Sequence, residues 1–116
     1  MSNVLSIKGF KLTRIAKLND EFRTTFRAGR VVLTNGVNCL PEDQLLEVLH
    51  KVKTFNDFND GNDPLGEHDF GAFEHNGVRY FFKIDYYDKT MAFGSNDPAN
   101  PEKTTRVLTI MTAGEY

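Results

Sequence analysis

The sequence predicts an α+β fold in which two helices pack on a mainly antiparallel sheet of four or five strands. Two segments in the first half repeat apolar residues every three or four positions, as helices do. The second half alternates apolar and polar residues around an Asn-Gly turn, as a β-hairpin does. A chain of 116 residues is the size of one core. We therefore expect a single domain over residues 1–116, with residues 1–11 as a loosely ordered N-terminal segment.

The first helix is predicted between Thr13 and Ala28. Thr13 is a suitable N-cap, because its hydroxyl can accept a hydrogen bond from a free backbone N–H at the helix start. Gly29 suits the left-handed residue that commonly follows a helix. The apolar residues of this segment fall on one helical stripe, which we expect to face the core: Ile15, Leu18, Phe22 and Phe26.

A short strand, a second helix and a loop follow. The β-branched run from Arg30 to Thr34 predicts a strand, and Asn35-Gly36 predicts the turn that ends it. Pro41 suits the first helical position, and acids in the first turn favour a helix that runs to about Phe55. Residues 56–66 are rich in Asn, Asp and Gly, which predicts a loop. The second helix has an apolar face made of Leu45, Leu46, Leu49 and Val52.

The second half of the chain is predicted to be sheet. Strands over residues 69–74 and 78–87 are joined by a tight hairpin at Asn76-Gly77. A further short strand is expected over residues 90–94, and after a Pro-containing loop the last strand covers residues 105–112. In the long strand the alternation assigns one apolar face to the core: Val78, Tyr80, Phe82, Ile84 and Tyr86.

The charges are unevenly distributed along the chain. The net charge is -2, yet residues 54–78 hold six acids and no Lys or Arg. Residues 1–53 hold nine basic and five acidic residues. A net negative charge argues against a nucleic-acid binder, whose affinity comes from neutralising phosphates. The exception is a basic set in the first third that would lie along an exposed helix side: Arg14, Lys17, Arg23, Arg27 and Arg30.

The single cysteine and the apolar pattern indicate the cellular compartment in which the protein is found. Cys39 has no partner for an intramolecular disulfide, and a lone cysteine is typical of a buried small apolar residue. A nucleophilic Cys39 with His50 or His68 as its base is the alternative. No apolar run reaches the length of a signal peptide core or a membrane span. We expect a cytoplasmic protein without membrane contact.

The segment from Asp63 to Gly71 contains the most chemically suggestive residues. His68 stands between Glu67 and Asp69, and carboxylates beside an imidazole serve metal binding or general acid–base catalysis. In a strand, however, Glu67 and Asp69 would share one face and His68 the other. The catalytic candidates are His68, Asp69 and Asp85, and the metal-ligand candidates are Asp63, Glu67, His68 and Asp69.

The same residues also have purely structural interpretations. Asp and Asn side chains bond their own backbone in turns, and acidic loops are often only solvated. Asp85 is expected to pair with Lys83 or Arg79. No Gly-x-Ser-x-Gly elbow, Walker loop or dinucleotide fingerprint is present, so the sequence offers no motif for hydrolases or nucleotide-cofactor enzymes. No cofactor is predicted, and the binding of a divalent metal ion stays an open alternative.

Several strings resemble a family of small bacterial proteins, domain of unknown function family 3768. They include residues 29–34, the Gly66 to Phe73 segment and residues 83–88. The Thr105 to Met111 strand and the closing Glu115-Tyr116 complete the resemblance. Members of the family are frequent on plasmids and other mobile elements. The resemblance therefore implies an accessory role rather than a housekeeping one.

Three functional hypotheses follow. The favoured one is a non-enzymatic interaction protein that inhibits a host or defence complex of the anti-defence type, contacting a protein partner through Asp57, Asp60, Asp63 and Glu67. The second is a metal-binding module or metal-dependent enzyme centred on Glu67, His68 and Asp69. The third is a small toxin or nucleic-acid binder that uses the N-terminal basic helix. A homodimer through exposed sheet aromatics is compatible with each of them.

Overall fold

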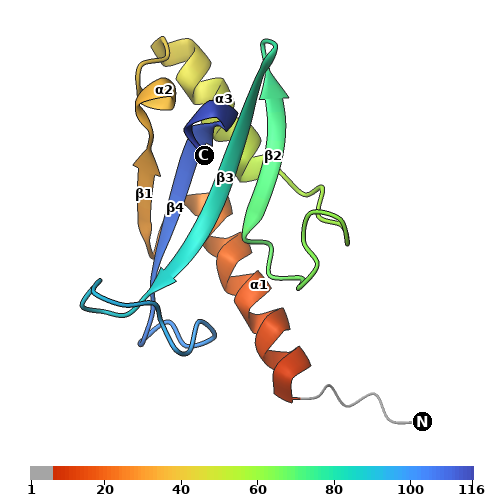
Figure 1. Ribbon diagram of the computed structural model, residues 1–116, viewed down its shortest axis with the longest axis vertical. Coiled ribbons are helices and arrows are strands. Elements are labelled where there is room, and N and C mark those ends of the chain that lie inside the picture. The colour runs from red at the N-terminus through yellow and green to blue at the C-terminus, as the bar shows by residue number, and fades with distance from the viewer. Residues whose placement is uncertain (1–6) are drawn as a thin grey trace.

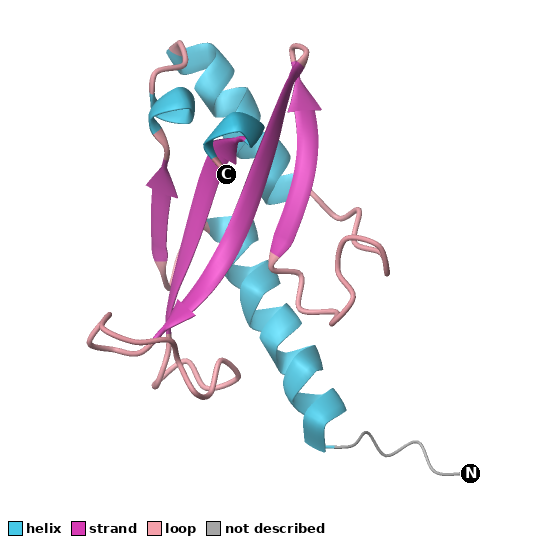
Figure 2. Ribbon diagram, viewed as in Figure 1, coloured by secondary structure: helices cyan, strands magenta, loops and turns pink. Residues whose placement is uncertain are grey.

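The computed structural model describes residues 7–116, and it confirms the α+β class (Figure 1). One layer is a four-stranded sheet, and helices α1 and α3 cover one of its faces (Figure 2). Among the described residues, no helix is both long and apolar enough to cross a membrane. In chain order the elements are α1 (Ile7–Thr25), β1 (Arg30–Leu33), α2 (Asn35–Asn38), α3 (Glu42–Thr54), β2 (Phe70–His75), β3 (Val78–Tyr87), β4 (Thr105–Thr112) and the 3-10 turn η1 (Ala113–Glu115).

The sheet is mixed, with strand order β1-β4-β3-β2. β2 pairs with β3 and β3 with β4 in antiparallel fashion, as the hairpin pattern predicts. The last strand, β4, lies between β3 and β1 and runs parallel to β1, with Val31 opposite Leu108. A parallel pair needs a long crossover connection, which here contains α3 and the β2–β3 hairpin. Nothing local in the sequence of β1 specifies that distant partner.

The core lies between the sheet and the helices. Tyr80, Phe82 and Ile84 of β3 are buried, as predicted for the inner face of the hairpin. Val78, assigned to the same face, is 43% exposed because it stands beside the turn at the end of the sheet. Gly71 on β2 makes room for this packing, because a Cβ there would stand 2.3 Å from the Phe82 ring. The other fully buried apolar residues come from both layers: Phe22, Val37, Val48, Val52, Leu108 and Ile110.

Helix α1 begins and ends earlier than its sequence predicts. Residues 7–11 form its first turns instead of a loose segment, while residues 1–6 lie outside the described part. Thr13 is therefore no N-cap, and its hydroxyl donates to the carbonyl of Gly9. At the other end Phe26 (φ 59°) and Ala28 (φ 70°) take the left-handed conformation expected for Gly29. Gly29 is required for a different reason, since a Cβ there would lie 2.6 Å from the Phe22 ring.

Three further local predictions are wrong. Asn35-Gly36 starts the short helix α2 instead of a turn, because the carboxylate of Glu115 accepts from the Thr34 hydroxyl and the Gly36 N–H at its N-terminal end. Residues 90–94 form no strand, and only Gly94 bridges to Tyr87. Cys39 is exposed rather than buried, and its thiol donates to Asn35.

The face of the sheet opposite α1 and α3 carries an aromatic cluster. Phe70 of β2 lies 5.3 Å from Phe81 of β3, measured between ring centroids. Tyr116 contacts both rings edge-on although it is 76% exposed. η1 fixes this end of the chain, because Glu115 also accepts from the backbone and hydroxyl of Thr112. The C-terminus is thus tied to β1, α2 and β4.

Candidate functional site

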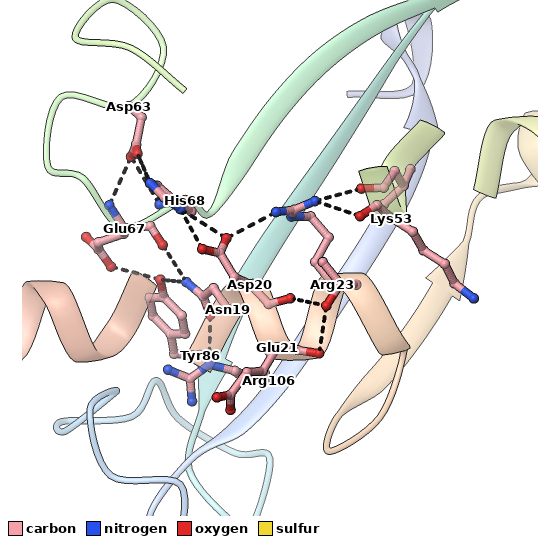
Figure 3. A network of polar contacts seen from close by, with 12 residues as sticks. Asn19, Asp20, Glu21, Arg23, Lys53, Asp63, Glu67, His68, Tyr86 and Arg106 are labelled. Carbon is pink, nitrogen blue, oxygen red and sulfur yellow. Dashed lines mark hydrogen bonds and ion pairs between the residues drawn. The ribbon is translucent and has the colours of Figure 1, made fainter. Parts of the chain in front are cut away.

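Three of the candidate residues, Asp63, Glu67 and His68, lie where the 56–69 loop docks on α1 (Figure 3). β2 begins at Phe70, so Glu67, His68 and Asp69 precede the strand and the strand alternation does not govern them. His68 takes the left-handed conformation with φ 57°. This conformation turns its imidazole toward α1. The expectation that His68 lies on the sheet face opposite Glu67 and Asp69 is therefore wrong.

His68 is held from three sides. Its ring stacks on Phe58 with 4.1 Å between centroids and an interplanar angle of 2°. Nδ1 lies 3.0 Å from each carboxylate oxygen of Asp20 on α1, and Nε2 lies 3.7 Å from Asp63. Both ring nitrogens thus face carboxylates of the protein itself. The Asp20 partner is 48 positions earlier in the chain, and no sequence signal pairs it with His68.

Asp63 shapes the turn that leads to His68. Its carboxylate is buried and accepts hydrogen bonds from the backbone N–H groups of Glu67 at 3.0 Å and His68 at 3.2 Å. A carboxylate that closes a turn in this way is the Asx behaviour expected of Asp in loops. Asp63, a candidate for partner binding and metal binding, therefore points into its own loop.

A second chain of hydrogen bonds crosses the domain beside His68. The Tyr86 hydroxyl donates to Glu67 at 2.8 Å and accepts from Nδ2 of Asn19 at 2.8 Å. Nδ2 of Asn19 also donates to the Glu67 carbonyl, and its Oδ1 accepts from Nε of Arg106 at 2.7 Å. Asn19 is fully buried, so this network joins α1, the loop, β3 and β4 through its amide.

Burial changes the acidity of three groups at this junction. It raises the pKa of the Tyr86 phenol far above its usual value; the Asn19 hydrogen bond opposes this rise and Glu67 adds to it. Burial also lowers the pKa of Arg106. Desolvation, followed by the charge of Glu67, raises the pKa of Asp69. Tyr86 therefore keeps its proton and acts as a hydrogen-bond donor rather than as a base.

The remaining candidates are also engaged within the fold. Asp85 pairs with Lys83 at 3.1 Å, which confirms one of its two expected partners. Over residues 7–116, no three His, Cys, Asp or Glu side chains converge in a way that could hold a metal ion. Asp63 faces His68 and the backbone of its own loop, whereas Glu67 faces Tyr86. The described geometry therefore does not assemble the four metal candidates into one ligand set.

The predicted basic stripe on the first helix does not form. Arg23 is 3% exposed, and its guanidinium donates to the carbonyls of Val52 and Lys53 and to Asp20. It therefore caps the carboxyl end of α3. Arg14 donates to the carbonyl of Ala99. Arg14 and Lys17 are exposed on α1 itself, whereas Arg27 and Arg30 lie beyond its end.

The fold and this junction define the chain as a small α+β protein whose mixed sheet is tied to its first helix by a buried polar network. A family model described as protein of unknown function (DUF3768) matches residues 33–115. The chain belongs to that family. The match contains Asp63, Glu67, His68 and Tyr86 and begins after α1. No curated protein and no solved structure matches the chain.

Proposed function

We propose that this chain is a non-enzymatic accessory protein that binds a basic surface of a partner protein through the acidic loop, residues 56–66. The observation that carries the proposal is that the loop is exposed, acidic and held in shape by its own side chains. Asp57 and Asp60 are exposed, and Leu65 between them and β2 is 61% exposed. A charged rim with an apolar contact is a common composition for a protein interface.

The loop is fixed before any partner arrives. Oδ1 of Asn59 accepts from the N–H groups of Gly61 and Asn62, and the Asn62 amide donates to the Asp57 carbonyl. Asp63 closes the far end of the loop by accepting from the Glu67 N–H. A binding loop that is already ordered loses less conformational entropy on association. Its shape therefore favours recognition of a partner.

The electrostatics favour a basic partner. Residues 54–78 carry six acids and no Lys or Arg, so the loop lies in the most negative stretch of the chain. Complementary charge accelerates association and rejects acidic partners. Asp57 and Asp60 are the residues that meet the partner. Asp63 and Glu67, also expected there, support the loop from within.

Binding accounts for the candidate catalytic residues better than catalysis does. A general base must reach a substrate proton, and a nucleophile needs a base beside it. Of the catalytic candidates, His68 is instead paired with Asp20 and Asp85 with Lys83. The metal candidate Glu67 is paired with Tyr86. The pairs of His68 and Glu67 hold the acidic loop against α1 and the sheet. These contacts therefore keep the acidic loop in a fixed position on the surface of the domain.

In its specific form, the proposal is a cytoplasmic protein encoded on a mobile element that inhibits a host or defence complex. Complexes that handle nucleic acids expose basic surfaces, because they neutralise phosphates. An acidic loop of fixed shape competes for such a surface. The family resemblance and the charge distribution support this form.

Affinity capture from bacterial lysate tests the proposal. The double variant D57K/D60K should lose the partner that the wild-type chain retains, while its melting temperature stays unchanged. The matched control E74K/E102K makes the same charge change at two exposed residues outside the loop and should retain the partner. Retention by D57K/D60K, or equal loss in both variants, would sink the proposal. D63N is no substitute, because Asp63 holds the turn.

A further inference from the structure

A cleft of about 680 Å³ lies at the end of α1. Its lining residues come from α1, the segment that leads into β1, the connection between β3 and β4, and the start of β4. A volume of this size is within the range of small-ligand sites, roughly 300–1,000 Å³. The acidic loop leads into β2, which forms the opposite edge of the sheet.

The cleft is lined by four cationic side chains. Arg27 and Arg30 come from the α1–β1 segment, Lys89 from the turn after β3, and Arg106 from β4. Glu21 is the one acidic residue among the lining residues. Only Arg27 and Arg30 are near each other in the sequence, so no basic run marks the site. The fold alone brings the four together.

Three of these cations are unpaired within residues 7–116. The side chains of Arg27, Arg30 and Lys89 are exposed and make no ion pair or hydrogen bond with any described residue. Two nearby acids are engaged elsewhere, since Asp88 accepts from the Thr90 hydroxyl and Asp97 pairs with Lys11. Glu21 makes no ion pair with a described residue, so one acid faces the four cations. Unpaired cations around a concavity focus a positive potential into it.

Arg106 forms the rigid part of the lining. It is 4% exposed, with Nε bonded to Asn19 and a second nitrogen bonded to the carbonyl of Pro98. Its guanidinium also lies over the Tyr86 ring, 5.2 Å from the centroid. These contacts fix a buried positive charge beside the cleft. Ala28 and Pro101, both exposed, add apolar surface to the lining.

From this geometry we infer that the cleft binds a phosphate-bearing ligand of nucleotide size. Guanidinium groups match phosphate oxygens in pairs of hydrogen bonds, and Lys supplies a point charge. The exposed Ala28 and Pro101 offer contacts for the apolar part of such a ligand. A long nucleic acid is disfavoured, because the net charge is -2 and the acidic loop occupies the other edge of the sheet. The inference is independent of the proposed partner of the loop.

Isothermal titration calorimetry of the full chain tests the inference with two probes, ATP and inorganic pyrophosphate. We expect both to bind at low salt and the affinity to fall as salt rises. R27E/K89E should weaken binding by about tenfold or more, because two attractive charges become repulsive. The control K17E alters an exposed lysine of α1 outside the cleft and should bind as the wild type does. If ATP binds no more tightly than pyrophosphate, the cleft recognises only the phosphate groups of its ligand.

Several outcomes would overturn the inference. One is the absence of heat with either probe at millimolar concentration, while the melting temperature is also unmoved. Another is an equal loss of binding in K17E, which would indicate a diffuse charge effect. A third uses a fluorescein-labelled 12-nucleotide DNA: tight binding that ATP does not displace would assign the cations to a polymer instead.

Discussion

Charged side chains gather in two regions of the domain. They are paired in one region and unpaired in the other. At the junction of the loop with α1, His68 faces Asp20 and Asp63, and Glu67 faces Tyr86. In the cleft, Arg27, Arg30 and Lys89 line a concavity without partners among the described residues. A buried or half-buried charge is tolerated only when it is paired, whereas an exposed one needs no partner. Pairing thus marks the first region as structural, whereas the second region is the ligand site that we infer.

The largest effect that tests this comparison is expected from Asn19→Leu. The change leaves Nε of Arg106, the Tyr86 hydroxyl and the Glu67 carbonyl without their partner in a buried place. Unpaired buried groups, one of them charged, should lower the free energy of unfolding by about 3–5 kcal/mol. Urea denaturation measures it. Asn38→Ala on the exposed end of α2 is the control, at about 0.5 kcal/mol or less. A loss below about 1 kcal/mol for Asn19→Leu would show that the network is not structural.

A smaller loss is expected from His68→Ala. The variant removes the stack on Phe58 and the contacts with Asp20 and Asp63, which should cost about 1–2 kcal/mol. His68→Phe keeps a ring on Phe58 and should restore part of the loss. Thermal unfolding of both variants separates stacking from polar contacts. Equal stability of His68→Ala and wild type would place His68 outside the structural region and reopen a catalytic role.

The matching change in the cleft should have almost no effect on stability. Arg27→Gln with Lys89→Gln removes two exposed and unpaired charges, so the free energy of unfolding should change by no more than about 0.5 kcal/mol. The relief of repulsion between the cations acts in the stabilising direction. Urea denaturation at low salt measures this small change in the free energy of unfolding. A loss above about 1 kcal/mol would mean that these cations hold the fold together instead of lying open to a ligand.

The smallest effect concerns a paired carboxylate at the surface. Hydrogen bonds from the Thr34 hydroxyl, Gly36 and Thr112 lower the pKa of Glu115 from 4.5 to about 2. Because the folded pKa is the lower one, this stabilisation is complete above pH 4.5 and disappears as the pH falls through 2. Glu115→Gln should remove that part of the pH dependence. Denaturation at several pH values across that window measures the free energy of unfolding of both proteins. Parallel pH dependences for the wild type and Glu115→Gln would contradict this prediction.

Local pattern predicted much of this fold. The periodicity of Phe22 in α1 and of Tyr80 and Phe82 in β3 identifies core residues, because each repeat reports which side of one element is buried. The parallel pairing of β1 with β4 escapes such reasoning, since it joins segments more than 70 positions apart. Glu115 acts in the same way on α2: it converts an Asn-Gly turn signal into a helix start from the other end of the chain.

The candidate site was predicted in part. The sequence singles out the segment around His68 but does not predict that it docks on α1. The pairing of Asp85 with Lys83 was expected, because the two residues lie on the same face of one strand. Asn19, Asp20 and Arg23 were missed as its partners, because polar residues on a helix are expected to be solvated until the packed neighbour is known. The cleft was missed for the same reason, since Arg27, Lys89 and Arg106 come from three separate segments.

The most direct test of the contrast between the two regions is a heteronuclear NMR titration of the labelled chain with sodium pyrophosphate. The account predicts saturable shifts of the backbone amides of Arg27, Arg30, Lys89 and Arg106, with the amides of Asp57, Asp60 and Leu65 unmoved. Shifts centred on the acidic loop, or none at millimolar pyrophosphate, would contradict it.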